Sequence, residues 1–117
     1  MHEETRVRVA AVVGSAAAHK SVGAVYDYSA RKFKTATCSV ENGVQGYDYG
    51  TRSHFSGNRG SLDFYDYQNR KHVQLKLEGQ NFSGYDNATR KHFSGTVNGS
   101  SISLYDYETR KYYNYSV

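Results

Sequence analysis

The chain has 117 residues, a net charge of +4 at neutral pH and a pI near 9.2. This length encloses one modest core and excludes a multidomain protein. With 12 Tyr and 5 Phe but no Trp or Pro, the composition is too aromatic for a disordered chain, and its single Cys excludes an internal disulfide framework. The positive charge favours acidic partners such as nucleic acid, sulfated glycan or an anionic surface.

Residues 1–20 differ in composition from the rest of the chain, which we treat as a single β-repeat domain at 21–117. The small, apolar stretch at 10–18 is compatible with a weak signal-peptide core followed by a small-residue cleavage site. Glu3 and Glu4 precede it, so its flank is not clearly positive. We therefore expect a leading strand or a loosely held tail. No stretch reaches the roughly 18 apolar residues of a membrane span.

Five copies of one short motif follow. A Tyr-Asp dipeptide recurs at spacings between 18 and 21 residues, and an Arg stands four residues after each Asp. Turn signals such as Asn98-Gly99 separate the copies. The pattern predicts five β-hairpins of about 20 residues and therefore an all-β meander of about ten antiparallel strands. The dipeptides begin at Tyr26, Tyr47, Tyr65, Tyr85 and Tyr105.

Pairing of these strands keeps the apolar residues on one face. In the last copy the loop pairs Leu104 with Tyr113 and Asp106 with Lys111, and the Asn-Gly turn before it pairs Phe93 with Leu104. A slip of one residue would turn every side chain over, so agreement between successive turns fixes the faces. The Asn58-Arg59 turn gives the expected pair Phe55–Leu62, and the Glu78-Gly79 turn gives Leu75–Phe82.

A sheet of this size with one apolar face must bury that face. We expect a closed up-and-down barrel because closure removes both edges. A flattened barrel or two-layer sandwich, and an open sheet that oligomerises, are the alternatives. The Asp side chains are expected to form exposed ion pairs with lysines across each hairpin, worth under about 1 kcal/mol each. Four glycines share the apolar face and leave room for large neighbours there: Gly46, Gly57, Gly84 and Gly95.

The opposite face carries a Tyr, Tyr, His pattern in register. Such rings combine an apolar body with a polar tip, so they can stack on sugars or bases. Cross-strand aromatic pairs also stabilise a sheet by about 0.2–1 kcal/mol each, so the pattern has a purely structural interpretation as well. The candidate ligand-binding residues are Tyr47, Tyr49, His54, Tyr65, Tyr67, His72, Tyr85, His92, Tyr105 and Tyr107. The flanking copies have Phe33 and Tyr112 where the others have His.

The arginines of the five motifs form, with nearby lysines, a basic rim that could bind an anion. His54, His72 and His92 lie on successive hairpins about 10 Å apart, which is too far for one metal ion. The chain has no nucleophile, phosphate-loop or metal motif, so we expect no enzyme, no metal and no cofactor. The rim arginines are Arg31, Arg52, Arg70, Arg90 and Arg110.

The Tyr-Asp-x-x-x-Arg spacing over residues 22–117 resembles the YD repeats of Rhs and teneurin shells. Those repeats usually have Gly before the Arg, where this chain has Ala30, Thr51, Asn69, Thr89 and Thr109. The aromatic hairpins are also similar to the choline- and glucan-binding repeats of bacterial surface proteins, but lack their Trp. Both resemblances imply an extracellular or cell-surface β-repeat protein.

These patterns together predict a non-catalytic binding module, with carbohydrate as the first ligand class, as in a lectin. Several equivalent sites would strengthen binding through multivalency. Single-stranded nucleic acid or another polyanion is the alternative ligand and would bind with steep salt dependence. A third hypothesis is a structural protein that self-associates through the Tyr face.

Overall fold

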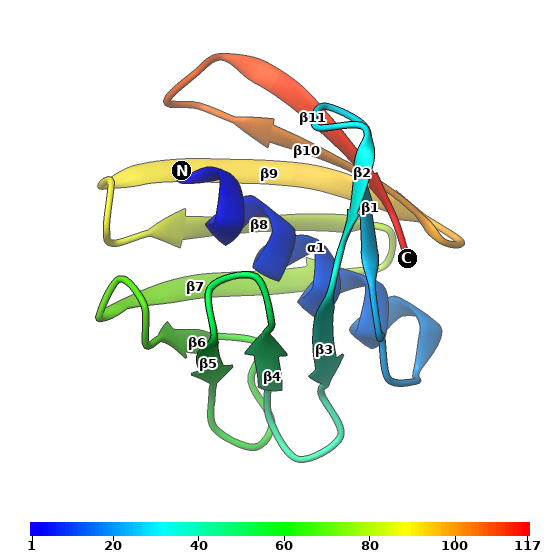
Figure 1. Cartoon of the computed structure of the whole chain (residues 1–117), viewed down its shortest axis with the longest axis vertical. Coiled ribbons are helices and arrows are strands. Elements are labelled where there is room, and N and C mark those ends of the chain that lie inside the picture. Colours follow the sequence, from blue (N-terminus) through cyan, green and yellow to red (C-terminus); the bar gives the residue numbers. More distant parts are fainter.

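The computed structural model describes residues 1–117 as one helix and one sheet (Figure 1). The helix is too short and too weakly apolar to cross a membrane. The five predicted hairpins are β1–β2, β4–β5, β6–β7, β8–β9 and β10–β11, called the first to the fifth hairpin below. The elements are α1 Glu3–Ala18, β1 Val25–Asp27, β2 Lys32–Lys34, β3 Ala36–Ser39, β4 Gln45–Asp48, β5 Ser53–Ser56, β6 Phe64–Asp66, β7 Lys71–Glu78, β8 Asn81–Asp86, β9 Lys91–Asn98, β10 Ser101–Asp106 and β11 Lys111–Ser116.

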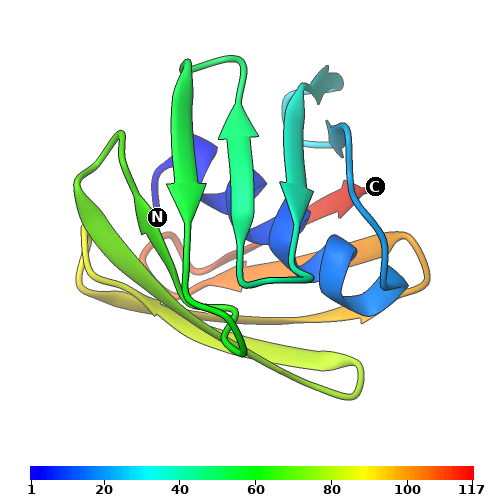
Figure 2. The same cartoon turned by 90° about the horizontal axis from the view of Figure 1, so that it is seen from below.

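The strands form a nearly closed antiparallel barrel, which confirms the predicted up-and-down meander (Figure 2). The second to fifth hairpins each pair with the next along the chain, and β1 of the first hairpin pairs with β11 of the fifth. The segment 32–39 completes the ring, because its first part, β2, pairs with β1 and its second part, β3, pairs with β4. A break at Thr35 divides this segment into two strands. The structure therefore has eleven strands where about ten were predicted.

Pairing within the hairpins follows the predicted register, whereas pairing between them does not. Leu104 pairs with Tyr113 as expected, but on its other side it faces Gly95 rather than Phe93. The turn residues are Gly99 and Ser100, and of these only Gly99 has a positive φ (61°), as in a type II′ turn. The shift is an even number of residues, so every side chain keeps its predicted face. The predicted pairs Phe55–Leu62 and Leu75–Phe82 are wrong in the same way, since the structure pairs Phe55 with Asp66 and Leu77 with Phe82.

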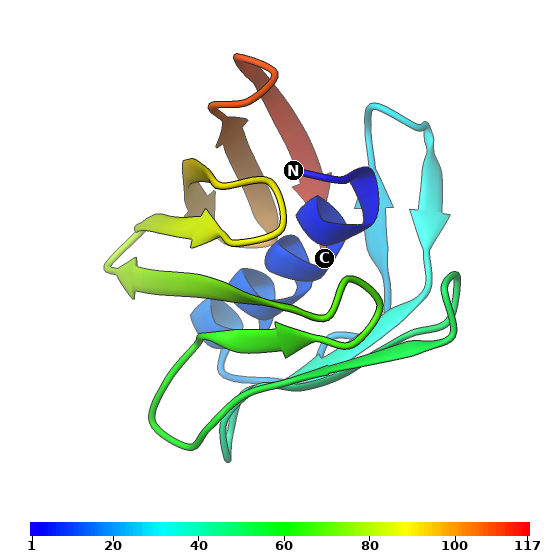
Figure 3. The ribbon, with the colours of Figure 1, turned by 90° about the vertical axis from the view of Figure 1, so that its left-hand side faces the viewer.

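Residues 3–18 form a helix inside the barrel, not the expected leading strand or loose tail (Figure 3). The helix α1 is buried without interruption from Thr5 to Ser15. A helix buried on all sides has no polar stripe, so its sequence carries no helical periodicity. Small residues allow the close fit, as a Cβ on Gly14 would lie 2.7 Å from Val117 Cγ2. The helix fills a lumen that is wider than the one an eight-stranded barrel closes with side chains alone.

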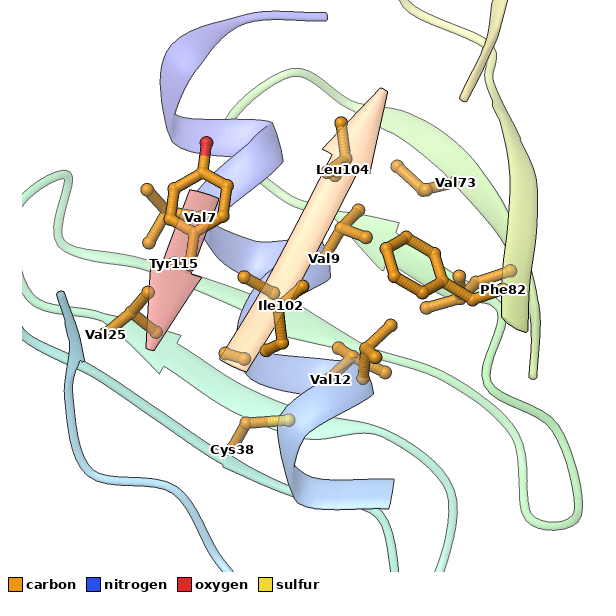
Figure 4. Close-up of a cluster of buried hydrophobic side chains, with 14 of the residues drawn as sticks. Val7, Val9, Val12, Val25, Cys38, Val73, Phe82, Ile102, Leu104 and Tyr115 are labelled. Carbon is orange, nitrogen blue, oxygen red and sulfur yellow. The ribbon is translucent and has the colours of Figure 1, made fainter. Parts of the chain in front are cut away.

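Residues on all sides of α1 pack against the inner face of the sheet and form the core (Figure 4). Val9 and Val12 lie in one buried cluster with Ile102 and Leu104. Cys38 belongs to the same cluster, and burial raises the pKa of its thiol to about 12. This thiol is therefore a small core side chain and is not a nucleophile near neutral pH.

Inner-face glycines stand directly opposite phenylalanines, as the sequence pattern suggests. A Cβ on Gly95 would lie 2.1 Å from the carbonyl oxygen of Ser103 and 2.4 Å from the Phe82 ring. The aromatic rings therefore lie over the glycines, and the centre of the lumen remains free for α1. The pairs are Gly46 with Phe55, Gly84 with Phe93 and Gly95 with Phe82.

Gly95→Ala is expected to destabilise the protein by about 1–3 kcal/mol, because the new methyl group meets a backbone carbonyl that cannot move independently of the sheet. Urea denaturation of both proteins measures the difference. Gly23→Ala is the matched control, since a Cβ there meets no atom within 4 Å. Equal midpoints for Gly95→Ala and the parent protein would contradict the tight approach of β9 and β10.

Candidate functional site

Every hairpin ends in the same turn, built around its Asp. In the fifth hairpin, Asp106 Oδ1 accepts a hydrogen bond from the N–H of Glu108 at 2.9 Å, and the N–H of Arg110 donates to the Asp106 carbonyl at 2.7 Å. A carboxylate that accepts from the backbone two residues later fixes such a turn, which explains the regular position of Asp. Asp27, Asp48, Asp66 and Asp86 accept the equivalent backbone hydrogen bond.

The arginine of each turn has a left-handed backbone conformation. The φ angles of all five rim arginines lie between 54° and 58°. This conformation costs a residue with a side chain about 1–2 kcal/mol, and glycine avoids that cost. A side chain kept repeatedly at a position that favours glycine suggests that the side chain itself has a role.

The carboxylates of these turns point into the barrel, which corrects the expectation of exposed Asp–Lys pairs. Asp106 does stand across from Lys111, but Asp106 is buried and Lys111 is exposed. The other four Asp side chains are buried in the same way. Alternation along each strand explains this placement, because Asp106 lies two residues beyond the core residue Leu104 and shares its face.

Arginines of α1 are the partners of three of the five inward carboxylates. Arg8 is fully buried and donates to Asp48 Oδ2 at 3.0 Å and to Asp66 Oδ2, so that one guanidinium joins the second and third hairpins. Arg6 donates to Asp106 Oδ2 at 3.1 Å in the fifth hairpin. Together these ion pairs fix the depth of the helix inside the barrel.

A second contact of Arg6 lies on the inner side of β11. Its guanidinium carbon lies 3.8 Å from the ring centre of Tyr113. Next to it is Tyr115, whose hydroxyl is buried without a hydrogen-bond partner. Burial raises the pKa of this phenol well above its usual value, so the hydroxyl is neutral in the folded protein.

The inward ion pairs change the charge of the outer surface. Two of the 15 basic residues, Arg6 and Arg8, and the five turn Asp among the 11 acidic residues belong to the interior. The remaining 13 basic and six acidic residues give the outer surface a net charge of +7, compared with +4 for the whole chain. The surface is therefore more basic than the composition suggests.

On the outer face each hairpin carries a compact cluster of rings. In the third hairpin Tyr65 packs edge-to-face on Tyr67 and on His72, with ring centres 4.8 and 4.9 Å apart. The first, second and fifth hairpins repeat this geometry, and the fourth keeps only the Tyr85–His92 pair. The second Tyr, present in four of the five clusters, is 51–55% exposed, so these clusters present ring surface to solvent.

Grooves between neighbouring hairpins combine a ring with a cation. The N–H of Tyr107 donates to the carbonyl of His92 at 3.3 Å, so the second Tyr of one hairpin lies beside the His of the preceding hairpin. Together with Arg90 and Ser94 these residues line a groove of about 760 Å³, whose one acidic lining residue is Asp63. An equivalent groove between the second and third hairpins is lined by Arg52, His54, Ser56 and Tyr67.

The first hairpin is displaced by two residues relative to both neighbours. Where it meets the second hairpin, the N–H of Tyr49 donates to the carbonyl of Thr35 at 3.0 Å, two residues beyond Phe33, which replaces the His. Where it meets the fifth hairpin, Tyr28 donates to Asn114 in the same shifted register. Tyr67 and Tyr107 are thus adjacent to the His of the neighbouring hairpin. At the two junctions of the first hairpin, the second Tyr is instead separated from the ring at the His position.

The ten residues predicted as ligand-binding all lie on the outer surface, and the five rim arginines are exposed. The first Tyr of each cluster is half-buried between its two neighbours, so it supports the other rings more than it presents its own. The prediction leaves out Phe33, Tyr112 and Tyr28, which are 71%, 69% and 55% exposed. Their positions in the repeat identify them as members of the ring clusters, because Phe33 and Tyr112 occupy the His position and Tyr28 the position of the second Tyr.

No three side chains of the metal-ligating types come together at one point, and His54, His72 and His92 each lie on a different hairpin. Comparison of the chain with protein-family models, curated proteins and solved structures finds no match. The chemistry of the outer surface is therefore the guide to function.

Arg8→Ala is expected to cost about 3–5 kcal/mol in unfolding free energy, because it leaves the carboxylates of Asp48 and Asp66 buried without a cation. Chemical denaturation measures this loss. Arg59→Ala is the control, since Arg59 is exposed and forms no ion pair. A stability loss below about 1 kcal/mol for Arg8→Ala, in the range of an exposed ion pair, would mean that the Asp–Arg cluster does not hold the helix in place.

Proposed function

We propose that the protein binds single-stranded nucleic acid on its outer belt, meaning the five ring clusters together with the rim arginines. The observation that carries this proposal is the inward orientation of the five turn carboxylates. It leaves basic side chains beside aromatic rings with little acidic surface between them. Proteins that bind single strands without sequence readout combine these two features, a positively charged groove and rings for stacking.

The same observation makes carbohydrate the second candidate. Protein sites for neutral sugars use aromatic faces together with planar hydrogen-bonding groups, which the Asp, Asn and His side chains of the repeats could supply. All five turn Asp are buried and accept turn N–H groups, and Asp48, Asp66 and Asp106 are also bonded to Arg6 or Arg8. A neutral sugar could therefore be contacted only by the rings and the His side chains. A polyanion could be contacted by the same groups and also by the unpaired arginines.

The repeat spacing also suits an extended strand. Successive hairpins are about 10 Å apart, so the two ring-and-cation grooves, which lie two hairpins apart, are separated by about 20 Å. A flexible single strand can follow such a row, with phosphates beside the arginines and bases beside the rings. The left-handed rim arginines support the proposal, because each keeps a cation at a position where glycine would relieve backbone strain.

An oligonucleotide of about 20 thymidines should bind with an affinity that falls steeply with salt, since each phosphate contact releases counterions and contributes about −0.7 to the slope of log K against log salt concentration. Fluorescence anisotropy between about 50 and 300 mM salt measures this slope. Binding of a neutral glycan that does not change with salt would favour the lectin hypothesis instead. Absence of oligonucleotide binding at the lowest salt would overturn the proposal.

Arg90→Gly should make the protein more stable and a weaker binder at the same time. Glycine removes about 1 kcal/mol of left-handed strain, while loss of one phosphate contact makes the salt slope shallower by about 0.7. Thermal unfolding and anisotropy measure the two effects. Arg59→Gly removes the same charge from a turn between hairpins, at the opposite end of the barrel, and should leave the slope nearly unchanged. Equal binding losses for the two variants would indicate a general effect of net charge and no rim site.

A further inference from the structure

We infer that a pocket where the first and second hairpins meet holds one nucleobase of the bound strand and prefers a base with an exocyclic amino group. This inference rests on the proposed function and makes it more specific. The pocket has a volume of about 480 Å³, within the range of small-ligand sites. Its lining includes Phe33 and Tyr49 with Thr35 between them.

The two-residue displacement of the first hairpin creates this pocket. At a regular junction the second Tyr bonds to the His position itself, as Tyr67 does to His54, so the two side chains are direct neighbours. At this junction Tyr49 bonds to Thr35, two residues beyond Phe33. β2 itself pairs only with β1, and Phe33 lies one diagonal step beyond the hydrogen bond between Tyr49 and Thr35, a step that spans about 7–8 Å in a sheet.

That separation matches the thickness of one inserted ring. An aromatic ring in van der Waals contact with a second ring on each side needs about 3.5 Å per contact, or about 7 Å in total. Phe33 and Tyr49 are 71% and 54% exposed, so their surfaces are not already covered by the protein. The slot between them is thus wide enough for one base.

Cations stand beside the slot where the phosphates of the strand would lie. Lys32 and Lys34 both line the pocket, on either side of Phe33 in the sequence. Lys32 is exposed and forms no ion pair, while Lys34 lies 3.4 Å from Glu3. Lys32 and Lys34 alternate with Phe33 along β2, so they border the pocket from the other face of the strand, and Lys32 is the cation free to meet a phosphate.

The acidic residues of the pocket indicate which base fits. Asp48 lines it but is already bonded to Arg8 and to its own turn. Glu4 also lines it, is half-buried and forms no ion pair. A free carboxylate accepts a hydrogen bond from an exocyclic amino group, such as N4 of cytosine, and repels the carbonyl oxygens of thymine. We therefore expect cytosine to bind more tightly than thymine.

Two variants with matched exposure test the pocket. Tyr49 and Tyr67 are both 54% exposed and pack on their first Tyr at 4.7 and 4.8 Å, but only Tyr49 borders the slot. Tyr49→Leu should lower the affinity for an oligonucleotide of about 20 cytidines roughly tenfold. Tyr67→Leu should lower it only about twofold, and neither variant should change the salt slope.

Inorganic polyphosphate, which has no rings, separates stacking from charge and should bind both variants equally. Glu4→Gln should reduce the preference of the protein for oligo-dC over oligo-dT. Equal losses for Tyr49→Leu and Tyr67→Leu in a protein that binds oligo-dC would overturn the pocket and leave the proposed function standing. A parent protein that binds no oligonucleotide would overturn both, as would a stable dimer that buries Phe33 and Tyr49.

Discussion

The structure depends on a buried set of ion pairs between two arginines of α1 and the carboxylates that begin three of the five hairpin turns. Arg8 joins Asp48 to Asp66, and Arg6 reaches Asp106. Without these cations, carboxylates would be buried without compensation at one end of the lumen, at a cost of several kcal/mol each. Without the helix, the barrel would enclose an unfilled space. The ion pairs therefore couple closure of the sheet to insertion of the helix.

The same interaction determines the character of the outer surface. Asp48, Asp66 and Asp106 each perform two tasks inside the barrel, since one oxygen fixes a turn and the other meets an arginine of the helix. Lysines and arginines across the turns are then left without acidic neighbours. The ring clusters lie on strands whose inner face is held by the core, so their geometry is rigid before any ligand arrives. Pre-organised rings beside unpaired cations reduce the ordering cost of binding a flexible strand.

Much of this could be predicted from the repeats. Alternation and turn spacing predict the meander, the barrel and the two faces, and the glycines opposite phenylalanines follow from the same register. The helix could not be predicted from periodicity, because a helix buried on every side has no polar stripe. The sequence does hold a signal for the inward carboxylates, because Asp106 lies an even number of residues from Leu104 and Ile102 and so shares their face. Arg6 and Arg8 in the first segment are the cations that can pair with such carboxylates. The displacement of the first hairpin arises from closing the ring, which local sequence does not encode.

The central claim is that the outer belt, and not the lumen, is the binding surface. The most direct test is amide and side-chain NMR of the full chain titrated with an oligonucleotide of about 20 nucleotides. The account predicts shifts at the exposed rings and rim arginines, such as Tyr49, Tyr107 and Arg90, with α1 unchanged. Shifts concentrated in α1 and the inner residues, or no shifts at all, would contradict it.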